Sequence, residues 1–167
     1  MSLLPEVRAS VSVPIVAAGG IAEPEAARVA LAAGADAISM GTRFAASEEA
    51  LSHPRYQQRL IEATSSDTVL TDLFDIGWTA PHRVLRNEVY DAWEAAGQPP
   101  TGQRPGEGEP VVTGPAGVIL RYSMHPALVG MDGDIDAMSL YAGLGVGSIA
   151  SIEPAGEIVE RFAAAVA

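Results

Sequence analysis

Residues 13–42 read VPIVAAGGIAEPEAARVALAAGADAISMGT, and this stretch decides the fold. Its first part, 13–18, is a short apolar run without polar alternation, which is typical of a parallel strand buried on both faces. A helix is predicted at 24–33, with Pro24 at the first helical position, where its missing N–H costs nothing. A second strand is predicted at 36–40. Strand, helix and strand together fit one right-handed βαβ crossover.

The composition of the 167 residues indicates a globular protein, because 48% are hydrophobic. The net charge of −11 repels phosphate backbones and anionic lipids, so neither nucleic acid nor a membrane is an expected partner. Cysteine is absent, which excludes disulfides, zinc–thiolate sites and thiol nucleophiles and fits a cytoplasmic setting by default. Residues 1–12 lack the apolar core of a targeting segment, and no stretch approaches the ~20 apolar residues of a membrane span.

The remaining sequence predicts mainly helices and loops. We expect helices at 43–50, 53–63, 84–96, 134–148 and 153–167, a short edge strand at 67–71, and a mobile loop at 98–117, where Pro or Gly fills ten of the twenty positions. Ser52 is the expected N-cap of the second of these helices. The chain is thus interpreted as a single partial domain, 1–167, with two final βα units at 1–63 and a helical and loop extension at 64–167.

Two glycine turns close the two predicted strands. Gly19-Gly20 and Gly41-Thr42 put small residues where backbone N–H groups can approach an anion, and together they fit one phosphate cup, as in the loops after strands seven and eight of a (β/α)₈ barrel. The Thr42 hydroxyl would add a hydrogen bond and Arg43 a charge, unless they only cap the next helix. From spacing alone, ordinary strand-to-helix turns remain an equal alternative.

These turns also carry a resemblance to a known family. The segments IVAAGGIA at 15–22 and MGTRF at 40–44 resemble the flavin phosphate-binding pair of nitronate monooxygenases, formerly called 2-nitropropane dioxygenases. Further matches follow in the same order at 46–49, 53–56, 83–87, 140–147 and 154–159. The first two segments are shared with flavin-dependent enoyl reductases, so the later matches carry the finer assignment.

The resemblance implies an α/β fold, the C-terminal part of an incomplete TIM (β/α)₈ barrel with flanking helices, because the complete fold takes about 250 residues or more. The chain would begin just before the seventh strand, and the histidine base and the loops around the flavin ring would belong to the other half. The resemblance further implies FMN-dependent oxidation of alkyl nitronates by dioxygen, which yields a carbonyl compound and nitrite, with this chain inactive alone. The residues implied at the FMN phosphate are Ala18, Gly19, Gly20, Met40, Gly41 and Thr42.

Other residue types give weaker signals. The histidines His53, His82 and His125 lie near prolines in loop-like sequence, which favours surface or capping roles, and none is predicted to be the catalytic base. At position 144 the chain has Leu144 where the family commonly has glutamine, which removes a polar contact near the flavin. Trp93 is predicted to lie in the core with Leu85 and Val89, while Trp78 stays open between flavin stacking and another role. Arg83 and Arg86 are expected on a solvated helix face.

Three acidic residues around Gly133 suggest a calcium loop, but the sequence argues against it. Counting from Asp132, position 12 is Gly143 instead of the bidentate glutamate that such a loop requires. A carboxylate-rich helix N-terminus explains Asp132, Asp134 and Asp136 better, and no metal is expected.

Two rivals to the nitronate monooxygenase hypothesis follow from the same residues. One is a flavin-dependent enoyl reductase. The other is a truncated half-barrel without enzymatic activity, which would cover its open sheet edges by self-association or by pairing with a missing N-terminal half.

Overall fold

The computed structural model describes residues 3–166. Its helices and strands are, in chain order, α1 (Leu3–Ser10), β1 (Val16–Ala18), α2 (Pro24–Ala32), β2 (Ala37–Ser39), α3 (Thr42–Ala45), α4 (Pro54–Glu62), β3 (Thr68–Thr71), β4 (His82–Leu85), α5 (Glu88–Ala95), β5 (Pro110–Gly114), β6 (Gly117–Leu120), β7 (Asp132–Gly133) and α6 (Ala155–Val166). Short 3₁₀ turns lie at Ser65–Asp67, Ile135–Ala137 and Leu144–Ser148.

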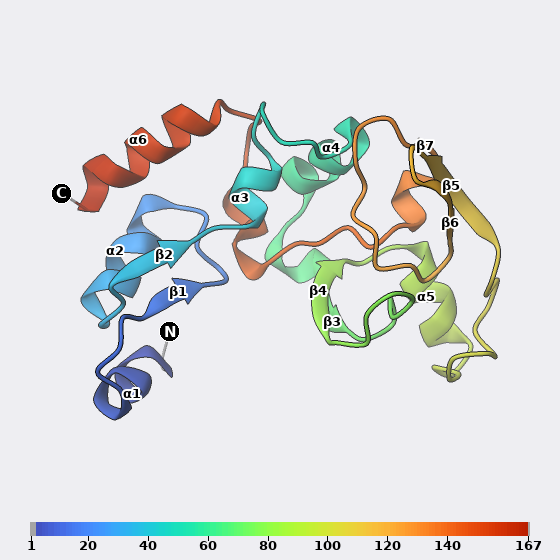
Figure 1. Ribbon diagram of the computed structural model, residues 1–167, viewed down its shortest axis with the longest axis horizontal. Coiled ribbons are helices and arrows are strands. Elements are labelled where there is room, and N and C mark those ends of the chain that lie inside the picture. Colours follow the sequence, from blue (N-terminus) through green and yellow to red (C-terminus); the bar gives the residue numbers. More distant parts are fainter. Residues whose placement is uncertain (1–2, 167) are drawn as a thin grey trace.

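The predicted βαβ unit is confirmed. β1 and β2 pair in parallel, with Ala18 opposite Ser39, and α2 connects them (Figure 1). The prediction that the first strand is buried on both faces is wrong, since the Val16 side chain is 59% exposed and Ala18 is exposed as well. The physical reason is that this sheet has only two strands, so it lacks the neighbours that bury a parallel strand.

Helix α6 covers the outside of this unit. The helix predicted at 153–167 is observed at 155–166, and its Ile158 and Phe162 are buried against Ala27 and Ala30 of α2 (Figure 1). Val166 is exposed at the helix end, and Ala167 lies outside the described residues.

The predicted helix at 84–96 begins four residues later than expected. Val84 and Leu85 lie in β4, which pairs antiparallel with β3 and thereby confirms the predicted edge strand at 67–71. The Asn87 side chain then caps α5 by accepting a hydrogen bond from the Tyr90 N–H. Val84 and Leu85 have the apolar spacing of a helix, but their pairing with β3 places them in a strand, because tertiary pairing outweighs local periodicity.

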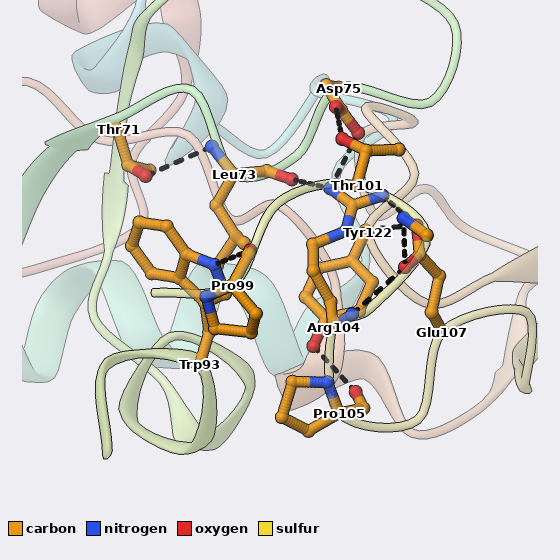
Figure 2. A network of polar contacts seen from close by, with 11 residues as sticks. Thr71, Leu73, Asp75, Trp93, Pro99, Thr101, Arg104, Pro105, Glu107 and Tyr122 are labelled. Carbon is orange, nitrogen blue, oxygen red and sulfur yellow. Dashed lines mark hydrogen bonds and ion pairs between the residues drawn. The ribbon is translucent and has the colours of Figure 1, made fainter. Parts of the chain in front are cut away.

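The Pro/Gly-rich segment 98–117, predicted to be a loop, lacks helix and strand only as far as residue 109. Its end forms β5, which pairs antiparallel with β6 and β7. Its middle is held by Arg104, whose side chain is buried and bonds the Leu73 carbonyl, Asp75 and Glu107 (Figure 2). Buried charge pairing gives this segment the order that apolar residues supply elsewhere.

Three further predictions about helices and caps are wrong. Segment 134–148 contains only two 3₁₀ turns, because its backbone pairs with β4 through Leu85 N–H to the Leu140 carbonyl. Helix α3 stops at Ala45 instead of continuing to 50, because the chain turns to pair with Glu153. The N-cap of α4 is His53 and not Ser52.

The largest hydrophobic core joins early and late parts of the chain. It unites Tyr56 and Leu60 of α4 with Leu85, Leu140 and other buried side chains from the second half. Within residues 3–166 the seven strands form three small sheets and close no barrel. No helix in that range has the length and apolar content needed to cross a bilayer.

Candidate functional site

The two glycine turns predicted from the sequence lie side by side. Since β1 and β2 are parallel and Ala18 is opposite Ser39, both strands end at the same sheet edge. Gly19-Gly20 leaves one strand there, and Met40-Gly41 leaves the other. The structure therefore brings the two turns together, as the phosphate cup requires.

Backbone conformation explains the residue types in the first turn. Gly19 and Gly20 have φ values of +92° and +73°, which side chains with a Cβ rarely adopt. A Cβ built at Gly19, Gly20 or Gly41 meets no protein atom within 4 Å. The space that these residues border is therefore open, and an anion can approach the backbone closely.

The N–H groups in these turns are free of backbone acceptors. Within residues 3–166, no backbone carbonyl accepts a hydrogen bond from the N–H of Gly19, Gly20, Gly41 or Thr42. Backbone N–H groups are strong donors, and four of them near one edge can hold a phosphate. The donor set thus fits a phosphate group without any positively charged side chain.

A third segment completes the site: the resemblance implied that the stretch around Leu144 lies near the flavin, but it did not include Gly143 among the residues at the phosphate. The Gly143 N–H donates to the Thr42 Oγ1 at 2.9 Å, which leaves the hydroxyl proton of Thr42 available to a ligand. A Cβ at Gly145 would lie 2.9 Å from the Gly20 carbonyl oxygen, so the segment packs closely on the first turn. The sequence feature that could have indicated this third segment is the glycine at every second position, 143, 145 and 147. We call this set, Gly19, Gly20, Gly41, Thr42 and Gly143, the glycine cup.

Arg43 does not supply charge to the cup. Its side chain is buried, its guanidinium donates to the Ala46 and Ser151 carbonyls at 2.8 Å each, and it lies 3.5 Å from the Glu153 carboxylate. Burial lowers the pKa of Arg43, and the Glu153 charge opposes that shift. Arg43 therefore ties α3 to the start of α6.

The two residues predicted beside the cup differ in exposure. Ala18 is exposed at the end of β1 and borders a groove of about 430 Å³ between α1 and β1. Met40 is half-buried and packs against the core under α2 and α6.

The other candidates have mostly structural surroundings. His53 caps α4, and His125 is exposed beside Ser123, as predicted, whereas His82 is half-buried at a separate cavity. Trp93 packs on a core cluster, and its indole N–H bonds the Pro99 carbonyl.

The two arginine candidates have structural surroundings. Arg83 lies in β4 rather than on a helix face, and Arg86 pairs with Asp91 and Glu94.

Of the three acidic residues, Asp134 caps a 3₁₀ turn and Asp136 pairs with Arg55 and Arg59. Within the described range, no group of three or more His, Asp or Glu side chains is arranged for a metal ion.

Comparison with known proteins identifies the family. The model of the family described as "Nitronate monooxygenase" matches residues 1–164. The chain belongs to the nitronate monooxygenase family. It is 38% identical over 74 residues to a probable nitronate monooxygenase of Bacillus subtilis, a match that covers 44% of this chain and 21% of that protein.

Two solved structures resemble the whole described fold. A nitroalkane oxidase from Streptomyces ansochromogenes matches with a TM-score of 0.69 and 32% identity, over 99% of this chain and 42% of that chain. FabK from Thermotoga maritima matches with a TM-score of 0.67 and 27% identity, over 98% of this chain and 47% of that one. The predicted α/β class and the incomplete barrel are confirmed. This member of the nitronate monooxygenase family spans less than half of each of these relatives.

Proposed function

We propose that this chain supplies the FMN phosphate site of an enzyme that oxidises alkyl nitronates with dioxygen to a carbonyl compound and nitrite. The observation that carries the proposal is the glycine cup, where four unbonded N–H groups meet at one sheet edge in a member of this family. When bound, FMN supplies the redox chemistry, and the protein supplies binding and orientation.

The proposed roles follow from the geometry. The backbones of Gly19, Gly20, Gly41 and Thr42 hold the phosphate, and Ala18 and Met40 flank it. The Thr42 hydroxyl is oriented by Gly143 N–H and donates its proton to a phosphate oxygen. The chain carries a net charge of −11, so the four free N–H groups have to overcome the repulsion between the phosphate and the rest of the chain.

We also propose that the chain alone does not turn over nitronates and that it is the C-terminal half of the barrel. In support, it spans 42% of the nitroalkane oxidase and leaves β1 with an apolar, exposed Val16 beside the groove under α1. An open strand edge of this kind recruits further strands, here from the missing half or from a second copy. Residues 1–63 and 64–167 would then act as one partial domain, which their shared core supports. A cytoplasmic location is proposed on the absence of cysteine.

Titration of the purified chain with FMN, followed by flavin fluorescence, tests the cup. Gly41→Asp is the informative variant, because a Cβ there meets nothing within 4 Å and the fold should tolerate it. Gly41→Asn has nearly the same shape without the charge. We expect saturable quenching with the wild-type chain, weaker binding with the asparagine variant and none with the aspartate variant, at unchanged thermal midpoints.

Equal FMN binding by all three proteins would refute the cup. Absence of binding by the folded wild-type chain, with a mass that rises with concentration, would favour the non-enzymatic assembly hypothesis. An enoyl reductase would use the same cup, so FMN binding tests the cofactor and not the reaction. Nitrite release from a nitronate tests the reaction, and we expect none from the 167 residues alone.

A further inference from the structure

A second cavity lies outside the glycine cup. It has a volume of about 300 Å³ and is lined by Trp78, Ala80, Pro81, His82, Met124, Pro126 and Tyr141. These residues come from the segment that enters β4, from the segment after β6, and from the extended chain that pairs with β4. Three separate parts of the chain thus build one small cavity that the cup does not use.

The side chains that line this cavity are mainly apolar. The Tyr141 hydroxyl donates to the Met124 carbonyl at 2.6 Å. The His82 Nδ1 lies 2.8 Å from the Ala80 carbonyl, so Nδ1 carries the proton and donates it there. The His82 Nε2 is buried and has no hydrogen-bond partner among the described residues, so it is a polar atom in an otherwise largely apolar wall. None of the lining residues is Asp, Glu, Lys or Arg. A group bound here would therefore be uncharged and mainly apolar.

One short segment connects this cavity to the glycine cup. Tyr141 lines the cavity, and Gly143, two residues further on, bonds to Thr42 in the cup. Two residues of extended chain span at most about 7 Å. A ligand in the cavity and a flavin whose phosphate occupies the cup would therefore contact the same strip of backbone.

We propose that this cavity binds the hydrocarbon part of the nitronate substrate. An engineered cavity of about 150 Å³ holds benzene, so about 300 Å³ suits one aromatic ring with a few more carbons, or an alkyl chain of similar volume. The chemical class is a nitronate with a medium-length alkyl or aryl group, its charged head outside the cavity. The identity of the ligand rests on the proposed function, whereas the apolar character of the site rests on the walls alone.

The test uses the chain without FMN and unreactive carboxylates, which share the planar shape and single negative charge of a nitronate. Trp78 is 68% exposed at the cavity rim, so its indole N–H resonance reports binding, while Trp93, bonded to the Pro99 carbonyl, is the internal reference. Along the series from propionate to decanoate, we expect shifts at Trp78 only. Affinity should rise about fourfold per added CH₂ until the cavity is full.

Two variants locate the binding. Ala80→Phe fills the cavity and should abolish the dependence on chain length, while Ala163→Phe, the same change on an exposed face of α6, should preserve it. Met124→Ala enlarges the cavity and should move the plateau to longer chains, which keeps the test decisive if Ala80→Phe unfolds. Shifts that are independent of chain length, or equal in Met124→Ala and wild type, would overturn the inference. FMN binding without these shifts would refute the cavity alone, and these shifts without FMN binding would refute the cup alone.

Discussion

Replacing Arg104 with methionine should destabilise the protein strongly. The side chain is 3% exposed and makes four kinds of contact: with the Leu73 carbonyl, with Asp75, with Glu107 and with the face of the Tyr122 ring (Figure 2). Methionine keeps most of the apolar stem over the ring but removes the charge and every donor.

The magnitude follows from what the substitution leaves behind. Removing one partner of a fully buried ion pair costs about 3–5 kcal/mol, because the other charge remains buried and unpaired. Asp75 and Glu107 keep 19% and 20% exposure, so water solvates them partly and the cost lies at or just below the lower end of that range. We expect a loss of about 2–3 kcal/mol, or roughly 5–10 °C in the thermal midpoint for a protein of this size.

Urea unfolding followed by circular dichroism measures this loss. The control is Arg161→Met, since Arg161 pairs with Glu153 at 44% exposure and its removal should cost about 1 kcal/mol or less. If the free energy of unfolding depends on urea concentration with the same slope in both proteins and only the urea midpoint is lower, the substitution has changed the stability and not the unfolded state. A loss below about 0.5 kcal/mol for Arg104→Met, or one equal to that of the control, would refute the claim that buried charge orders this segment.

Three further predictions concern acid, the cup and the core. The Arg104 guanidinium lowers the pKa of Glu107 below its ordinary 4.5, so the ion pair stabilises the fold above pH 4.5 and this stabilisation is lost as the pH falls through the lower pKa of the folded state. In a series of urea unfolding curves at decreasing pH, the midpoint of the wild-type protein should therefore fall more steeply than that of Arg104→Met. Parallel curves would contradict this. Gly145→Ala should weaken FMN binding, because the added Cβ would lie 2.9 Å from the Gly20 carbonyl oxygen in the cup. Gly156→Ala is the control, since a Cβ there meets no atom within 4 Å and should leave FMN binding unchanged. Equal dissociation constants for the two variants would contradict the close packing of Gly145 on the cup. Leu140→Ala should cost about 2–5 kcal/mol in urea unfolding, since its side chain is fully buried in the largest core, and a cost under 1 kcal/mol would place it outside that core.

Local sequence was sufficient for the βαβ unit at 13–42 and for bringing its two glycine turns to one sheet edge. The strand, helix and strand at 13–42 depend on neighbours close in the chain, and the glycines at 19 and 20 have the positive φ values that only their residue type adopts readily. The spacing of apolar residues gave wrong predictions where the backbone pairs with a segment far away in the sequence. Val84 and Leu85 have helical spacing but pair with β3, and the chain between the two 3₁₀ turns of 134–148 pairs with β4.

Charged residues were the other source of error. Arg43 follows the second glycine turn directly, which favoured a role in binding an anion, but its partner Glu153 is 110 positions away. Arg104 likewise lies among prolines and glycines that predict mobility, and its partner Asp75 comes from a different segment. Composition does not reveal such partners, because ion pairs depend on tertiary proximity rather than on local spacing.

The bond from Gly143 to Thr42 has a consequence for how the protein is made. Both glycine turns are synthesised before the segment that closes their third side, which follows 101 residues after Thr42. At about 5–20 residues per second, several seconds pass between the synthesis of the two turns and that of their last neighbour. A nascent chain would therefore carry the complete short motif without a competent binding site. Ligand binding at the cup should begin only after Gly143 has left the ribosome.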